Sequence, residues 1–166
     1  ASGEKLLKIA KNTYFINDRR LDDNGSNSYL PAGARIGVNP DFLIEGIRMN
    51  IKEFGLPNKL FRHHGGGIEH LTMVPATINE MLMQSHEGVI RLFPCWNKKS
   101  AASFENLRAD GAFLVSSELK DQKITSFKIK SLKGRPCNVE NSDVKSVVRE
   151  FISIESTRRT SLFEST

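Results

Sequence analysis

The sequence predicts an α+β protein in which N-terminal helices are followed by an antiparallel β-sandwich. Over residues 1–87 the apolar residues recur at the three- and four-residue spacing of helices. After Gly88 they alternate with polar residues as in half-buried strands. Short strands that follow one another closely, with turn residues and no helix between them, are typical of antiparallel sandwiches. We therefore expect two parts, residues 1–87 and residues 88–166.

The clearest predicted helix spans residues 39–54. Asn39 suits the N-cap, and Pro40 suits the first helical position because its missing N–H would have no helical partner there. Five apolar residues share one face at helical spacing: Leu43, Ile44, Ile47, Ile51 and Phe54. Phe42 and Met49 lie off this stripe, so we expect them to contact further helices.

Two more helices are expected around this one. Residues 77–86 begin with a capping box, in which Thr77 caps the first turn and Glu80 reaches back to it. Residues 4–13 form the other helix, with Leu6, Leu7 and Ala10 facing inward. Residues 17–38 lack periodicity and are rich in Asn, Asp, Gly and Ser, so we expect a long irregular loop there.

Six strands are expected in the second half. They are predicted at residues 89–96, 104–109, 112–119, 123–132 and 144–154, with a last one near residues 161–163. Turn residues separate them, among them Asp110-Gly111 and Lys120-Asp121-Gln122.

Composition excludes several classes of protein. With 39% hydrophobic and 26% charged residues, the chain is neither disordered nor collagen-like. No apolar run approaches the ~18 residues of a membrane helix, so no membrane partner is expected. The net charge of +5 is spread along the strands rather than gathered in a block, so no nucleic acid is expected either. Cys95 and Cys137 lack metal-ligand spacing and are interpreted as two buried thiols, neither of them a nucleophile.

Residues 62–70 carry the most chemistry, because they hold three of the four histidines, a carboxylate and three consecutive glycines. Three interpretations remain open for this segment. His63, His64, Glu69 and His70 could hold a metal, although the chain lacks the helical pair of histidines that zinc proteases use. The segment could be a polar turn. In the third interpretation Glu69 is a catalytic carboxylate in a sugar-sized pocket, and glycoside hydrolysis needs a second such group.

A resemblance bears on this choice. The segment Ile68-Glu69-His70 through Glu80-Met81-Leu82-Met83-Gln84-Ser85-His86, followed by Val89-Ile90-Arg91-Leu92-Phe93-Pro94, resembles the end of the catalytic barrel in family 95 glycoside hydrolases. Ser103 to Phe113 resembles the hairpin that opens the C-terminal β-sandwich of that family. The similarity covers residues 17–139. It implies inverting hydrolysis of α-L-fucosides and related L-sugars, without a cofactor.

The resemblance also implies roles for particular residues. The family carries a base-side carboxylate eleven residues before the glutamate of its motif, and counting back from Glu80 reaches Glu69. Residues 71–73 are Leu-Thr-Met where the family has Asn-Phe-Gly. His63, His64 and His70 would then shape the substrate pocket.

The general acid and the water-holding asparagines of the family lie earlier in its barrel, and this chain has no counterpart of them. We therefore expect a C-terminal fragment of such an enzyme, inactive alone, comprising the last helices of an α/α barrel and the sandwich. A start at Ala1, with no methionine before Met49, fits this expectation. The expected partners are a carbohydrate substrate and the missing N-terminal part, and the resemblance suggests a secreted or periplasmic enzyme. Self-association through uncovered helix faces is also expected.

A second hypothesis from another class is a non-catalytic β-sandwich module that binds carbohydrate or stabilises a neighbour. Aromatic side chains on its surface would support binding, because sugar faces stack on them. Trp96 follows a predicted strand and is interpreted as a core or rim residue.

Overall fold

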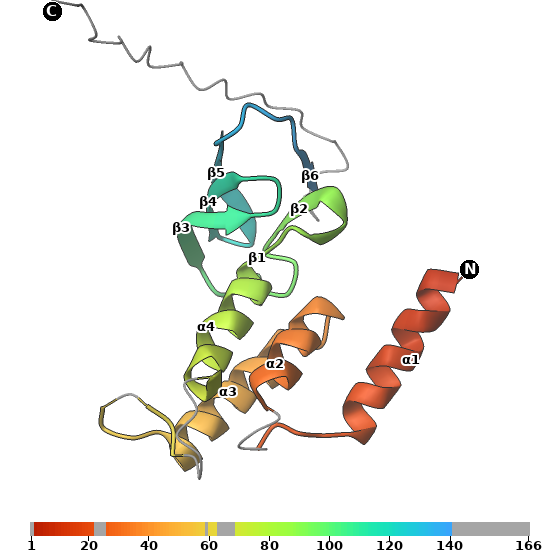
Figure 1. The fold of residues 1–166 in the computed structure, drawn as a ribbon, viewed down its shortest axis with the longest axis vertical. Coiled ribbons are helices and arrows are strands. Elements are labelled where there is room, and N and C mark those ends of the chain that lie inside the picture. Colours follow the sequence, from red (N-terminus) through yellow and green to blue (C-terminus); the bar gives the residue numbers. More distant parts are fainter. Residues whose placement is uncertain (1, 22–25, 59, 63–68, 141–166) are drawn as a thin grey trace, which may run out of the picture.

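The computed structural model describes residues 2–21, 26–58, 60–62 and 69–140 (Figure 1). Its elements, in chain order, are α1 (Ser2–Ile16), α2 (Ser26–Arg35), α3 (Pro40–Phe54), α4 (Glu69–Leu82), β1 (Met83–Gln84), the 3₁₀ turn η1 (His86–Gly88), β2 (Val89–Leu92), β3 (Ala102–Ala109), β4 (Phe113–Lys120), β5 (Lys123–Ser131) and β6 (Asn138–Glu140). Helices come first and strands follow, which confirms the mixed α+β class. Among the described helices, none is long and apolar enough to cross a membrane.

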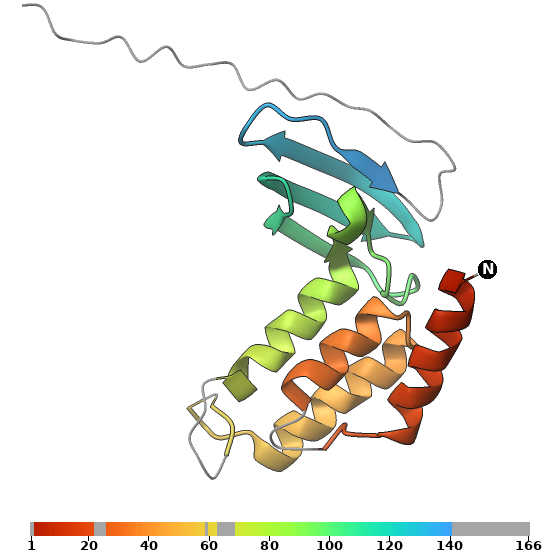
Figure 2. The same ribbon diagram turned by 45° about the vertical axis from the view of Figure 1, so that its right-hand side comes forward.

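The strands among the described residues form two three-stranded sheets. Strands β3, β4 and β5 make an antiparallel meander, whose second hairpin turns at Asp121 and Gln122, both with positive φ (Figure 2). The other sheet has the order β1-β2-β6, with β1 antiparallel and β6 parallel to β2. The parallel β2–β6 pair differs from the expected all-antiparallel arrangement. These two strands are joined by the whole β3–β4–β5 meander and not by a tight turn, so they can run in the same direction.

The interior consists of two apolar clusters. One lies among the helices and includes Leu30, Leu43, Met73 and Met81, all with no exposed surface. The other takes side chains from both sheets, such as Ile90, Val115 and Leu119. Half-buried Ile78 and Trp96 pack against both clusters. The helical and β parts therefore meet along one continuous apolar joint, at the end of α4 that leads into β1 (Figure 1).

Helix α2 overturns the expectation of an irregular loop over residues 17–38. It buries Tyr29, Leu30 and Ala34 on one face. Gly33 lies on the same face, and because it has no side chain, Tyr14 and Leu43 can approach it closely. Pro31 lies inside the helix and removes one backbone donor. Because serine, asparagine and proline disguise the apolar spacing, only the tertiary packing reveals the helix.

Helix α3 agrees with its prediction at both ends. Asn39 caps it, with its Oδ1 accepting a hydrogen bond from the Asp41 N–H at 2.8 Å. Leu43 and Ile47 are buried as expected, whereas Ile51 is 49% exposed.

Phe42 was expected to need helices that the chain lacks, and this expectation is wrong. Its ring contacts those of Tyr14 and Phe15 from α1, at centroid distances of 6.4 and 5.5 Å. The Arg20 guanidinium lies 4.3 Å above its centroid. This chain therefore covers Phe42 with its own first helix and the loop that follows.

Helix α1 is present but presents a different face from the one predicted. Leu6 and Leu7 are 64% and 43% exposed, and the buried residue of this helix is Tyr14. The Tyr14 ring stacks on that of Tyr29 at 3.9 Å between centroids. Because its buried contact lies near its C-terminal end, the apolar residues of the first turns stay exposed.

The predicted helix over residues 77–86 begins too late and ends too late. Helix α4 starts at Glu69, so Thr77 lies inside it, fully buried, and is not an N-cap. The Thr77 hydroxyl instead donates to the Met73 carbonyl oxygen at 2.7 Å. The helix ends at Leu82 because the next two residues pair with β2 as a strand.

Strands β3, β4 and β5 lie within two residues of their predicted bounds, while the first predicted strand ends at Leu92 rather than Trp96. Phe93 follows with a positive φ of 52°, which turns the chain out of the strand. The strands predicted over residues 144–154 and 161–163 lie outside the described residues.

Candidate functional site

The predicted site residues fall at the start of α4 or before it. Glu69 and His70 are the first two residues of α4, and their side chains lie outside the described part of the chain. His63 and His64 belong to the segment 63–68, which also lies outside it. Glu69 thus opens a helix rather than lying in a loop as predicted, and the N-terminal end of a helix favours a negative charge.

The other end of α4 leads into residues 80–86, and side chains of this segment hold the two parts of the molecule together. The Glu80 carboxylate pairs with Arg35 of α2 at 2.6 Å. The Gln84 side chain is buried, and its amide donates to the carbonyl oxygens of Ala34 and Glu80 at 3.2 and 3.0 Å. Since Met81, Leu82 and Met83 are buried between these polar residues, this segment has a structural role.

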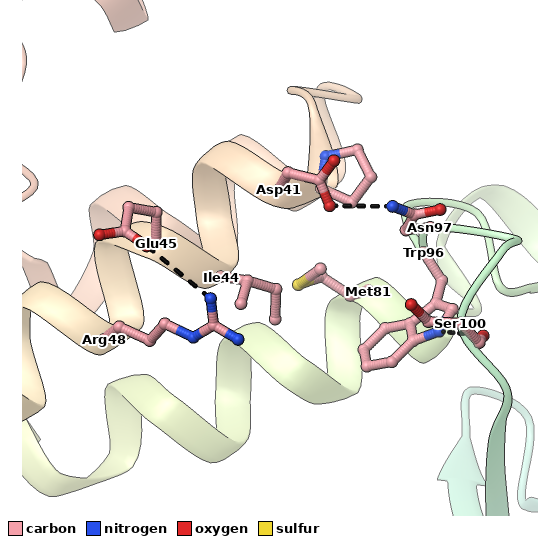
Figure 3. Close-up of a pocket in the computed structure, with 9 residues that line it drawn as sticks. Asp41, Ile44, Glu45, Arg48, Met81, Trp96, Asn97 and Ser100 are labelled. Carbon is pink, nitrogen blue, oxygen red and sulfur yellow. Dashed lines mark hydrogen bonds and ion pairs between the residues drawn. The ribbon is translucent and has the colours of Figure 1, made fainter.

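A cavity of about 480 Å³ lies beside this joint, between α3, the last turn of α4 and the β2–β3 loop (Figure 3). Pro40, Ile44 and Met81 form its apolar wall, together with the indole of Trp96. Asp41, Glu45, Arg48, Asn97 and Ser100 supply its polar groups. This volume is within the ~300–1,000 Å³ typical of small-molecule sites.

Hydrogen bonds hold two walls of this cavity, which we call the junction cavity, in place. The Trp96 indole N–H donates to the Ser100 carbonyl oxygen at 3.0 Å. The Asn97 amide donates to the Asp41 carboxylate at 3.0 Å and so ties the β2–β3 loop to the first turn of α3 (Figure 3). The cavity therefore has an aromatic wall of defined orientation, with Asn97 and Ser100 beside the indole and Glu45 and Arg48 further along α3 (Figure 3).

Sequence reasoning missed this cavity, although part of its signal was available. Asp41, Glu45 and Arg48 are spaced by four and three residues, which places them on one face of α3, away from buried Leu43 and Ile47. Trp96 was interpreted as a core or rim residue. Only the fold brings it to that face of α3, from a loop much further along the chain.

A second cavity, of about 360 Å³, is lined by Arg35, Glu80, Gln84, His86, Arg108 and Asp110. Its central side chains are already engaged, since Arg35 pairs with Glu80 and Gln84 bonds the backbone. These groups hold α2, α4 and β1 together.

Both cysteines are free thiols, as predicted, but only Cys95 is buried and Cys137 is half-buried. Burial raises the pKa of the Cys95 thiol to about 11, and its Sγ donates to the Val38 carbonyl oxygen at 3.1 Å. Burial also raises the pKa of the half-buried Cys137 thiol. A buried thiol with a raised pKa stays protonated at neutral pH, so Cys95 is not a nucleophile.

Within the described ranges, no group of three His, Cys, Asp or Glu side chains is placed to hold a metal ion. The histidine segment on which the metal interpretation depends lies outside those ranges. Comparison with known proteins finds no family model that matches this chain and no curated protein that is similar to it.

Proposed function

We propose that this chain is the C-terminal part of a glycoside hydrolase that acts on α-L-fucosides or related L-sugars. Its helices are the last helices of an α/α barrel, and its strands form the C-terminal β-sandwich. Glu69 is the base-side carboxylate, which polarises the amide that activates the attacking water, and His63, His64 and His70 shape the sugar pocket. The general acid belongs to the preceding part of the protein, since hydrolysis with inversion needs two such groups.

The observation that carries the proposal is the placement of α4. Its first residue is Glu69, and its last turn begins the segment that resembles the family most closely. The buried Gln84 and the Arg35–Glu80 pair fasten that last turn to α2 and to the sheet. Glu69 is the first residue of this helix, and the positive end of a helix favours the charged form of a carboxylate, which suits the base-side role.

Exposed apolar side chains give further support. Leu6, Ile9 and Ile16 of α1 are 64%, 50% and 81% exposed, and Ile51 of α3 is 49% exposed. Burying one such side chain is worth roughly 1.5–3 kcal/mol, so a row of them favours contact with further helices. In a barrel of paired helices those neighbours would come from the preceding part of the protein.

The test is a kinetic study of the complete protein that contains this chain, with 4-nitrophenyl α-L-fucoside and α-L-galactoside as substrates. We expect Glu69→Gln to lower kcat by at least ~100-fold with little change in KM, because a general base contributes about 10²–10⁴-fold. His63→Ala and His70→Ala should instead raise KM. The 166-residue chain alone should show no turnover.

Glu53→Gln is the matched control, since Glu53 is an exposed carboxylate near the end of α3 and should leave both constants unchanged. A Glu69→Gln enzyme with wild-type kcat would remove Glu69 from the mechanism. Turnover by the isolated 166-residue chain would refute the fragment proposal.

A further inference from the structure

The junction cavity has the wall on which a sugar ring stacks. Trp96 is the only tryptophan of the chain, and its half-buried indole borders the cavity together with Ile44 and Met81 (Figure 3). The hydrogen bond from its N–H to Ser100 fixes the ring, so little side-chain entropy remains to be lost on binding. The C–H face of a pyranose is apolar and flat enough to lie against such a ring.

The polar side of the junction cavity offers the groups that hydroxyls need. Glu45 and Arg48 are 58% and 74% exposed and lie 3.9 Å apart, which makes a weak surface pair. A carboxylate and a guanidinium each bind two neighbouring hydroxyls at once, as acceptor and donor respectively. Exchanging a weak ion pair for such hydrogen bonds costs little, so both side chains are available to a ligand. Asp41 and Asn97 are already bonded to each other and hold that part of the wall in place.

Charge restricts the class of ligand. Two carboxylates, Asp41 and Glu45, face the junction cavity against one guanidinium, Arg48. This balance disfavours a phosphate, a nucleotide or a uronic acid, because each would bring further negative charge. A ligand that is flat and apolar on one face, rich in hydroxyls at its edge and uncharged fits all three observations.

We infer that the junction cavity is a binding site for a neutral oligosaccharide, with a pyranose ring stacked on Trp96 and its hydroxyls bonded to Glu45 and Arg48. The site is separate from the proposed hydrolytic one. Met81 is twelve residues after Glu69 on the same helix, which places the two about 18 Å apart along α4 at 1.5 Å per residue. The junction cavity would hold a stretch of polysaccharide outside the hydrolytic centre. Binding there needs no catalytic carboxylate.

The experiment uses the 166-residue chain and its single tryptophan as a reporter. Emission of Trp96 is titrated with cellotetraose, mannotetraose, xylotetraose and 2′-fucosyllactose, and with tetragalacturonate as the anionic counterpart. We expect a saturable change with at least one neutral sugar and none with tetragalacturonate. The Glu45→Ala/Arg48→Ala double variant should weaken that binding at least tenfold without changing the unfolding midpoint.

Lys52→Ala/Glu53→Ala is the matched control, because it removes one charge of each sign from exposed positions of α3 outside the cavity. Its affinity should equal that of the wild type. Absence of saturable change with every neutral sugar, equal binding of tetragalacturonate, or unchanged affinity of the Glu45/Arg48 variant would overturn the inference. None of these outcomes bears on Glu69, whose role depends on kcat in the complete protein.

Discussion

Gly33 illustrates how single residues decide the packing of the helices. It lies in α2 on the face that meets α1 and α3, and it is buried. A Cβ at this position would overlap the hydroxyl of Tyr14 and come within 2.8 Å of Leu43 Cδ2. Tyr14 is itself stacked on Tyr29, and Leu43 has no exposed surface, so neither side chain has room to retreat. Glycine is the residue that lets three helices meet here.

We predict that Gly33→Ala destabilises the chain by about 1–3 kcal/mol, the usual cost of overpacking a filled core. The measurement is the urea unfolding midpoint followed by circular dichroism. Gly3→Ala is the matched control, since a Cβ added at Gly3 of α1 would meet no heavy atom within 4 Å, and alanine there should be neutral or stabilising. Equal midpoints for the two variants would mean that the contact among Tyr14, Gly33 and Leu43 is not tight.

The burial of a residue could be predicted where the apolar spacing within its own helix identifies the buried face. Leu43 and Ile47 lie at the centre of the apolar stripe of α3 and are buried. Ile51 continues the same stripe but is half exposed, although its neighbour Asn50 is fully buried. Spacing identifies a face, and only the neighbouring elements decide how much of that face is covered.

At the scale of elements, α3 was predictable because its signals are local. Asn39 accepts the Asp41 N–H, and Pro40 occupies the first helical position. We predict that Asn39→Ala lowers the free energy of unfolding by about 1 kcal/mol, because the donor at Asp41 loses its partner. Asn39→Asp keeps the acceptor and should retain wild-type stability, and urea unfolding followed by circular dichroism measures both variants. An alanine variant as stable as the aspartate variant would show that water replaces the cap without cost.

Helices α2 and α4 were misjudged because their determinants are not local. Each contains a proline, Pro31 or Pro75, and tertiary packing outweighs the loss of one backbone hydrogen bond in each. Thr77 is a good N-cap residue by type, yet its hydroxyl finds a partner one turn back inside the helix. The hairpins of β3, β4 and β5 were predictable for the opposite reason, since alternation and turn residues act within a few positions.

At the scale of the whole molecule, the sequence could not predict which surfaces meet. The junction cavity forms between α3 and the β2–β3 loop, which is far from α3 in the sequence. Likewise, β6 pairs with β2 although the whole β3–β4–β5 meander separates them in the sequence. The first predicted site, by contrast, was inferred from a compact motif. Its side chains at positions 63–70 lie outside the described residues, so its roles rest on the kinetic test of Glu69 and the histidines.

The last prediction concerns the uncovered face of α1. This helix is attached near its C-terminal end, through the Tyr14–Tyr29 stack, while Leu6, Leu7 and Ile9 are exposed. The apolar cluster of the β part is built mostly from strand residues and contains no residue of α1. In hydrogen exchange on the 166-residue chain we therefore expect the slowest amides in β3, β4 and β5, and the fastest helical amides in α1. Raising the protein concentration should slow exchange in α1, because self-association would cover its apolar residues.

Leu6→Lys/Ile9→Lys should abolish that concentration dependence without altering exchange in the strands, since both changed residues are already exposed and far from the β cluster. Lys5→Ala/Lys8→Ala is the control on the same helix, and it should keep the dependence because it leaves the apolar row intact. A strictly monomeric chain whose α1 amides exchange as slowly as those of the strands, at every concentration, would show that α1 completes a compact fold by itself. In that case the exposed row would no longer argue for further helices, and the proposal of an incomplete barrel would lose its support from the surface.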